Sequence, residues 1–228
     1  MPVNIWNMAD NRLHYETVSP LLRNVLHEMM SCEIFAPFLL VGGTALSLQL
    51  GHRVSDDIDL FTDAEYGSLD FQAMQSWLRN RFPYCIGDCG TIVGFGASYI
   101  VGNSREESVK VDLFYTDAFI RPAIVIDGIR LAAQEEIAAM KLDVVSHKGR
   151  KKDFWDLHEL HGSYTFVQML DYYAERYPYG ATRNEASVLL TDFSRADEDV
   201  DPRCLRRKIW QLIKLDIAEW TEQELTVF

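Results

Sequence analysis

The stretch GGTALSLQLGHRVSDDIDLF, residues 42–61, decides the fold because it joins a glycine turn to an acidic strand. The apolar residues 38–41 precede it and predict a short buried strand that ends at the two glycines. Residues 45–50 predict a short helix, and residues 57–61 predict a second short strand. Strand, turn, helix and second strand follow one another closely, which predicts a domain of mixed α and β structure.

The glycine turn, Gly42-Gly43-Thr44, is the first candidate binding site. Two glycines allow a sharp backbone turn and let a ligand approach the main chain closely. The helix that follows begins with unpaired N–H groups, which suit a phosphate, and Thr44 adds a hydroxyl. Because a Gly-Gly pair is also common at an ordinary turn, both interpretations stay open for this motif alone.

The acidic strand is the second candidate. Residues two apart on a strand point to the same face, so Asp57 and Asp59 share a face while Ile58 and Leu60 point into the core. Two such carboxylates repel each other unless solvent surrounds them or a divalent cation neutralises them. Mg²⁺ prefers carboxylates, waters and substrate phosphates, which this arrangement can supply. The alternative is an exposed acidic edge, although acidic side chains are disfavoured in strands.

Asp112 is the third candidate, within a predicted strand over residues 108–115. Its apolar neighbours point one way and its carboxylate points the other way. If this strand lies beside residues 57–61, the three carboxylates form a cradle for two metal ions, which could activate a hydroxyl and neutralise a nucleotide's phosphates. Otherwise Asp112 is a solvated residue on the outside of the sheet.

The fourth candidate region follows in a predicted helical segment. Lys141 has mostly apolar neighbours, which places it at the rim of the core, either as a phosphate-binding charge or as a lysine whose stem covers apolar surface. Residues 147–152 contain four of the 22 positive charges and predict either a patch for a polyanion or a solvated loop. Asp153 and Asp156 follow on one helix face, and Asp153 also suits the start of a helix.

The rest of the chain predicts strands first and helices later. Predicted helices cover residues 11–30 (with Ser19-Pro20 as cap and first turn), 71–81, 134–145, 153–160, 166–176, 185–193 and 202–220. Predicted strands cover residues 92–101 and 108–115, and a hairpin over 123–131 turns at Asp127-Gly128. The predicted fold class is therefore α+β, a mixed sheet flanked by helices and followed by a helical C-terminal part. A soft boundary at residue 132 predicts regions 1–132 and 133–228, packed as one unit.

Two segments resemble a known family. Residues 42–61, with a Gly-Gly turn, His-Arg and Asp-x-Asp in fixed order, resemble the signature of the AbiEii/AbiGii-type toxin nucleotidyltransferases. Residues 137–160, with Met-Lys-Leu at 140–142 and Lys-Lys-Asp-Phe-Trp-Asp-Leu at 151–157, resemble the downstream motif of the same family. The resemblance covers roughly residues 35–165 and implies a nucleotidyltransferase core similar to that of DNA polymerase β.

The resemblance also implies a reaction and a set of site residues. The reaction is transfer of a nucleoside monophosphate from a nucleoside triphosphate (NTP) to an acceptor hydroxyl, with two Mg²⁺ ions as cofactors, tRNA as the acceptor and an antitoxin protein as a partner. The implied residues are the metal-binding carboxylates Asp57, Asp59 and Asp112, the triphosphate-binding Gly42, Gly43, Thr44 and Lys141, and the downstream catalytic acid Asp153.

Composition leaves two other functions open. The net charge of −12 disfavours a broad nucleic-acid-binding surface and favours a cationic small-molecule acceptor, as in nucleotidyltransferases that adenylylate antibiotics. The third possibility is a module that binds a nucleotide or a partner without catalysis, against which the intact Asp-x-Asp argues.

Composition also bears on the location of the protein. The chain is 48% hydrophobic but has no apolar run long enough to span a membrane, and its first residues carry no secretory signal. Four cysteines, expected to be reduced thiols, favour the cytoplasm.

Overall fold

A computed structural model describes residues 12–90 and 94–226 of the chain. The strands are β1 Leu39–Leu40, β2 Asp57–Thr62, β3 Tyr84–Ile86, β4 Gly96–Gly102, β5 Ser108–Tyr115, β6 Ile124–Ile126 and β7 Ile129–Leu131. They form one sheet in the order β3-β4-β5-β2-β1-β7-β6. The β2–β5 and β1–β7 pairs are parallel and the other neighbouring pairs are antiparallel, so the sheet is mixed.

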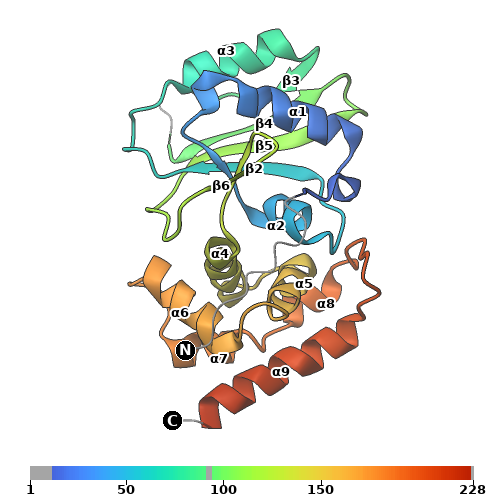
Figure 1. Cartoon of the computed structure of the whole chain (residues 1–228), viewed down its shortest axis with the longest axis vertical. Coiled ribbons are helices and arrows are strands. Elements are labelled where there is room, and N and C mark those ends of the chain that lie inside the picture. Colours follow the sequence, from blue (N-terminus) through green and yellow to red (C-terminus); the bar gives the residue numbers. More distant parts are fainter. Residues whose placement is uncertain (1–11, 91–93, 227–228) are drawn as a thin grey trace.

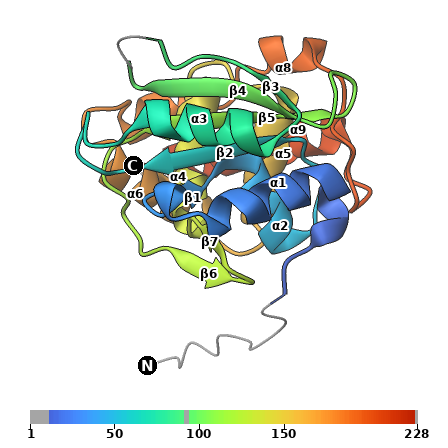
Figure 2. The same ribbon diagram turned by 90° about the horizontal axis from the view of Figure 1, so that it is seen from above.

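Helices cover both faces of this sheet. They are α1 Pro20–Ser31, α2 Gly42–Leu50, α3 Phe71–Arg81, α4 Gln134–Ser146, α5 Lys151–Leu160, α6 Phe166–Arg176, α7 Arg183–Leu189, α8 Ser194–Glu198 and α9 Trp210–Thr226, with 3-10 turns at Tyr15–Thr17 and Glu33–Phe35. α1 and α3 lie across one face (Figure 2), and α2, α4 and α5 lie beneath the other face (Figure 1). α6, α7 and α9 lie farther from the sheet, beyond α4 and α5.

The two central strands carry the middle of the apolar core. Ile58 pairs with Val111 and Leu60 with Leu113 across the parallel β2–β5 ladder, and all four side chains are fully buried. Because side chains alternate along a strand, the residues between them point to the opposite face, toward α4 and α5. The apolar alternation therefore fixes which side chains of β2 and β5 are available for a site.

The predicted fold class is confirmed, because the chain forms a mixed sheet flanked by helices. The bounds of α3, α6 and β5 coincide with the predicted ranges. The predicted hairpin is also present: β6 and β7 are antiparallel, and Asp127 and Gly128 have φ angles of 51° and 76°. Asp-Gly favours such a left-handed two-residue turn.

In the first half of the chain, several predicted bounds are wrong. The helix expected over residues 11–30 begins at Pro20, because the Ser19 hydroxyl accepts a hydrogen bond from the Leu22 backbone N–H and caps it there. Residue 11 lies outside the described residues, as does residue 92, where a strand was expected to begin. The two glycines start α2 instead of only ending β1, and β3 was not predicted.

The C-terminal half also differs from its prediction. The expected helix over residues 185–193 ends at Leu189, as α7, and the separate helix α8 begins only at Ser194. α9 begins at Trp210 instead of residue 202. The physical reason is a backbone pairing that a helix would break: the Val54 N–H donates to the Arg203 carbonyl and the Leu205 N–H donates to the His52 carbonyl. The chain before α9 is therefore held extended against the segment that leads into β2.

A buried ion pair connects the sheet to the helices that follow it. Glu136 of α4 accepts hydrogen bonds from Arg176 of α6 and, at 2.7 Å, from the backbone N–H of Ile120. Both charged side chains are fully buried. This pair ties the connection after β5 to α4 and α6, while the division of the chain at residue 132 stays a prediction.

Candidate active site

The predicted site residues meet at a cavity between the sheet and the helices beneath it. The cavity has a volume of about 530 Å³ and is lined from the sheet side by β2, β5 and the start of α2, and from the helix side by α4 and α5. Its lining includes all of the predicted residues except Thr44: Gly42, Gly43, Asp57, Asp59, Asp112, Lys141 and Asp153.

The three carboxylates of the cavity come from adjacent strands. Asp59 of β2 lies directly opposite Asp112 of β5 in the parallel ladder, and Asp57 lies on the same face of β2. The condition that these two strands lie side by side is therefore met. Burial, together with the neighbouring charges of Asp112 and Asp57, raises the pKa of Asp59. Three acidic groups this close favour a cation in their midst.

The chemistry of these groups fits a hard divalent cation. Asp112 Oδ1 is buried and has no hydrogen-bond partner among the residues that the structure describes. Asp112 Oδ2 accepts a hydrogen bond from Lys110 Nζ at 2.6 Å, and Asp57 Oδ2 lies 3.4 Å from Lys152 Nζ. Within residues 12–90 and 94–226, no three His, Cys, Asp or Glu side chains are gathered into a formed ligand cluster. The carboxylate oxygens are of the kind that Mg²⁺ binds. In this structure, lysine side chains lie against two of the three carboxylates, those of Asp57 and Asp112.

The start of α2 is shaped by Gly42. This residue has a φ of +66°, which side-chain-bearing residues adopt only with strain. A Cβ atom on Gly42 would lie 2.9 Å from Asp59 Oδ2, so the glycine keeps open the space beside that carboxylate. Val41, the N-cap residue of α2, provides no side-chain cap for the first N–H groups of the helix. The turn therefore presents main-chain donors beside the carboxylates.

Thr44 has a different position from the one expected. Its side chain is buried and does not line the cavity. The Thr44 hydroxyl donates to the main-chain carbonyl of Asp57 and lies 2.9 Å from the Ser55 hydroxyl. The side chain therefore fixes the start of β2 against α2, and a direct contact with phosphate would have to come from the main chain of Thr44.

Lys141 also differs from its expected position at the rim of the core. Its side chain is only 7% exposed and forms part of the cavity wall. Lys141 Nζ lies 2.6 Å from Asp153 Oδ1 and 2.7 Å from Asp156 Oδ2. Burial alone would lower the pKa of Lys141, but Asp156 and Asp153 keep it above its usual value. The lysine is therefore a buried cation held by two carboxylates.

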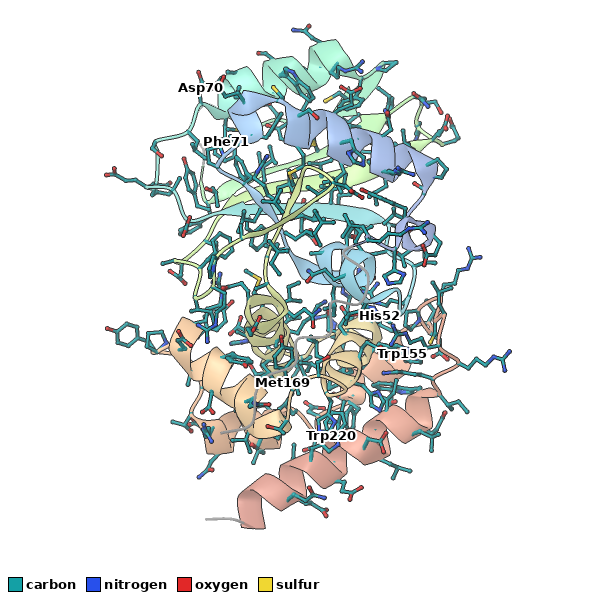
Figure 3. The ribbon with its side chains drawn as sticks, in the orientation of Figure 1. His52, Asp70, Phe71, Trp155, Met169 and Trp220 are labelled. Atoms are coloured by element: carbon teal, nitrogen blue, oxygen red, sulfur yellow. The ribbon has the colours of Figure 1, made fainter. Side chains whose placement is uncertain are left out.

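Asp156 joins this lysine to two residues that were not predicted as site residues. Arg53 binds Asp156 through two hydrogen bonds, Nε to Oδ1 at 2.6 Å and Nη2 to Oδ2 at 2.8 Å, and His52 Nε2 lies 2.8 Å from Oδ1. Burial alone would raise the pKa of Asp156, but Arg53 and Lys141 hold it well below its usual range. Figure 3 shows His52 at the junction of the sheet half and the helical half.

Gly43 allows this network to pack beneath the turn. A Cβ atom on Gly43 would meet Arg53 Nη2 at 2.2 Å. The second glycine is thus required for the close approach of a buried guanidinium to α2. Two features of the sequence could have indicated that His52, Arg53 and Asp156 belong to the site. They are the His-Arg pair within residues 42–61 and the position of Asp156 three residues after Asp153.

The basic run over residues 147–152 is divided between two environments. Arg150 and Lys152 line the cavity, whereas Lys151 is buried and pairs with Asp201 at 3.0 Å. Asp153 accepts a hydrogen bond from the Arg150 backbone N–H at 3.0 Å, so it also caps α5 as the sequence suggested. Part of this run is therefore in a position to contact a polyanion at the cavity.

Comparison with known proteins identifies the family. Residues 26–220 match the family described as "Nucleotidyl transferase AbiEii toxin, Type IV TA system". The chain therefore belongs to the AbiEii family of nucleotidyltransferase toxins. The protein aq_aa25 from Aquifex aeolicus is 31% identical over 138 residues, which cover 59% of this chain. The match spans 63% of that relative, less than two thirds of its length.

Solved structures share the fold at lower sequence identity. JHP933 from Helicobacter pylori has a TM-score of 0.56 and 20% identity, covering 89% of this chain and 88% of its own. MenT4, a nucleotidyltransferase toxin from Mycobacterium tuberculosis H37Rv, has a TM-score of 0.53 and 12% identity, covering 88% and 83%. These similarities support the same nucleotidyltransferase-like α+β architecture.

Two further expectations concern the environment of the protein. Among the described residues, no helix is both long enough and apolar enough to cross a membrane. All four cysteines, which lie at positions 32, 85, 89 and 204, are free thiols.

Proposed function

We propose that this protein is a Mg²⁺-dependent nucleotidyltransferase that transfers a nucleoside monophosphate from an NTP to an acceptor hydroxyl. The observation that carries the proposal is a single cavity in which three carboxylates of β2 and β5 lie beside the N-terminus of α2. Membership in the AbiEii family supports nucleotidyl transfer. The cavity supplies oxygen ligands for a metal and N–H donors for phosphates.

In this proposal the triphosphate lies against the start of α2. Gly42 and Gly43 bring the main chain close to the phosphates, and the main chain of Thr44 extends the same turn. Lys141 contributes a charge from the cavity wall. An ammonium has three N–H donors, of which Asp153 and Asp156 accept two, so one remains for a phosphate oxygen. Asp153 then acts by orienting Lys141.

The carboxylates Asp57, Asp59 and Asp112 would hold the metal ions. Bound Mg²⁺ supplies positive charge at the phosphates and favours ionisation of the attacking hydroxyl. The acceptor oxygen forms a bond to the α-phosphorus in line with the bond to pyrophosphate, which breaks as pyrophosphate leaves. Asp112 is the carboxylate that we propose to take the proton of the acceptor hydroxyl.

We propose RNA as the acceptor, with the 3′ end of tRNA as the first candidate. The family description names a toxin, and Arg150 and Lys152 line the cavity where they can contact RNA phosphates. A cationic small molecule is the second candidate. Asp143 adds a further carboxylate to the lining, and the chain carries a net charge of −12, so a cationic acceptor would be attracted to the cavity.

The position of a radioactive label tests the reaction and the acceptor together. Each of the four NTPs, labelled at the α- or the γ-phosphate, is incubated with Mg²⁺ and either total RNA, tRNA or an aminoglycoside. The proposal expects α-label, and no γ-label, in tRNA; α-label only in the aminoglycoside would support the second candidate. Tight nucleotide binding without transfer to any acceptor would support a non-catalytic module, and γ-label in the product would contradict nucleotidyl transfer.

We also propose an antitoxin as the protein partner and the cytoplasm as the compartment. The family description, a type IV toxin–antitoxin system, supports the partner, and the four free thiols support a reducing compartment. Expression of the chain alone should then slow bacterial growth, and co-expression of a neighbouring gene should restore it. Equal growth inhibition by the Asp57→Asn/Asp59→Asn variant would contradict a toxic role for the transferase site.

A further inference from the structure

The side chain of Lys110 lies among the carboxylates of the cavity, between Asp57 on the neighbouring strand and Asp112 on its own strand. It lies on β5 directly opposite Asp57 of β2, two residues before Asp112 and on the same face of the strand. Its ammonium donates a hydrogen bond to Asp112 Oδ2 at 2.6 Å. The sequence analysis places this lysine in the predicted strand over residues 108–115 but assigns it no role.

We propose that Lys110 is an internal counter-cation, which holds Asp112 in the absence of metal and moves to the phosphates of the nucleotide when metal binds. This inference rests on the proposed function, because it assigns a role at the same site. It makes Lys110 a nucleotide-binding residue and a competitor of the metal.

The contacts of Asp112 support the competition. Its two carboxylate oxygens differ: Oδ2 holds Lys110, while Oδ1 is buried without a hydrogen-bond partner among the described residues. A divalent cation on this carboxylate would meet the positive charge of Lys110 at hydrogen-bond distance from the same group. Because two cations this close repel each other, binding of the metal weakens the ion pair and favours its opening.

The exposure of Lys110 supports its movement. Its side chain is 50% exposed, whereas Lys141, on the cavity wall, is 7% exposed and is held by two carboxylates. Lysine carries its charge on a flexible four-carbon stem, so a half-exposed ammonium can change partners at little cost.

Lys152 makes a weaker version of the same contact. Its ammonium lies 3.4 Å from Asp57 Oδ2, and its side chain is 30% exposed. The role of counter-cation is assigned to Lys110 and not to Lys152, because the contact of Lys110 with its carboxylate is shorter and the other oxygen of that carboxylate has no partner among the described residues. Arg150 lines the same cavity, but its side chain lies beside Asp153, with Nε 4.0 Å from Oδ2. Arg150 therefore provides a control for removing one positive charge from the cavity.

The proposal predicts effects of opposite sign for two ligands. Mn²⁺ binding, measured by electron paramagnetic resonance without nucleotide, should become about three- to tenfold tighter in Lys110→Met, since the competing ion pair is gone. Affinity for an α,β-nonhydrolysable NTP at saturating Mn²⁺, measured by calorimetry, should fall about tenfold, the loss of one charge-assisted hydrogen bond. Lys110→Arg should lie between the wild type and Lys110→Met on both measurements.

The control separates a direct contact from a general charge effect. Arg150→Met removes the same unit charge, so any change in Mn²⁺ affinity that it shares with Lys110→Met comes from the electrostatic field of the cavity. Equal changes in the two variants, or unchanged Mn²⁺ affinity in Lys110→Met, would overturn the role of Lys110 while leaving the proposed function intact. If the wild-type protein bound neither Mn²⁺ nor nucleotide, the proposed function itself would fail and this inference with it.

Discussion

The negative charge of Asp59 lowers the stability of the folded protein when no metal is bound, and a bound cation would remove this effect. Its pKa is raised by burial and by Asp112 and Asp57, so ionisation of Asp59 destabilises the metal-free folded state. The cost is absent at low pH, where the carboxyl is protonated in the folded and unfolded chains, and it grows as pH rises through the unfolded pKa toward the raised folded pKa. Asp59→Asn should therefore raise the metal-free free energy of unfolding at pH 7.

Urea unfolding at pH 7 and at pH 3.5 measures this effect. The gain should shrink at the lower pH, and Asp117→Asn, which changes an exposed aspartate outside the cavity, should give no gain at either pH. A loss of stability in Asp59→Asn at pH 7 would mean that the carboxylate is stabilising without metal, against the proposed role.

Lys141 should affect both stability and nucleotide binding. Lys141→Met would leave Asp153 and Asp156 buried with fewer positive partners, and breaking such a buried pair costs about 3–5 kcal/mol. Nucleotide affinity at saturating Mg²⁺, measured at a temperature where the variant is folded by circular dichroism, should fall about tenfold or more. Unchanged affinity beside the expected loss of stability would remove Lys141 from the phosphate site and leave it a purely structural cation.

At the residue scale, the sequence predicts which acidic side chains share a face better than it predicts the partners of the candidate site residues. The alternation along β2 was sufficient to place Asp57 and Asp59 on one face, because strand geometry has a fixed period, whereas the position of Asp112 beside them depends on the pairing of β2 with β5. The burial of Lys141 could not be predicted, since it depends on how α4 packs against α5, which carries its partners Asp153 and Asp156. The Thr44 hydroxyl points away from the cavity because it donates a hydrogen bond to the Asp57 carbonyl of β2, a tertiary contact that the sequence does not reveal.

At the scale of elements, the start of α2 should be sensitive to a single methyl group. Gly42→Ala adds the strain of a positive φ and brings a Cβ to 2.9 Å from Asp59 Oδ2. We expect a loss of stability of about 1–2 kcal/mol from the backbone strain and a fall in metal-dependent nucleotide affinity from the crowded carboxylate. Urea unfolding and calorimetry measure the two effects separately.

Gly67→Ala is the matched control for this prediction. Gly67 also has a positive φ, +82°, but a Cβ there would meet nothing within 4 Å. The Gly67→Ala variant should lose about as much stability as Gly42→Ala but should bind nucleotide with the affinity of the wild type. If both variants bound nucleotide as the wild type does, the space beside Asp59 would have no role in binding.

The elements themselves were predicted where the signal is local. α3, α6 and β5 have a clear hydrophobic period and matched their predicted bounds, and the Asp-Gly turn of the hairpin is specified by its own backbone preference. α9 begins later in the chain than predicted because residues 203–205 pair with residues 52–54, a contact between distant parts of the chain. The short β3 strand likewise depends on its partner β4.

At the scale of the whole molecule, Arg53 and Asp156 should couple the two halves. Both are buried, and their hydrogen bonds join the segment before β2 to α5. Arg53→Met and Asp156→Asn should each cost about 3–5 kcal/mol, and the double variant less than their sum, with a coupling energy of about 1–3 kcal/mol. The exposed pair of Arg121 and Glu175, treated in the same way, should show a coupling below about 1 kcal/mol.

The same network should set the acid sensitivity of the molecule. The lowered pKa of Asp156 gives stability that is present above the unfolded value of about 3.9 and is lost as pH falls through the folded pKa. Additive effects of the two substitutions, together with acid unfolding unchanged in Asp156→Asn, would show that the network does not hold the halves together.

The central claim is that the carboxylates of β2 and β5 bind a nucleotide through a metal ion. Calorimetric titration of the four NTPs, as nonhydrolysable analogues with Mg²⁺, tests it most directly on the wild type and on Asp57→Asn/Asp59→Asn. We predict that the wild type binds at least one NTP only when Mg²⁺ is present and that the double variant binds it about 100-fold more weakly, a loss of about 2.7 kcal/mol, while remaining folded. Wild-type protein that binds none of the four, or a double variant that binds equally well with Mg²⁺, would contradict the account.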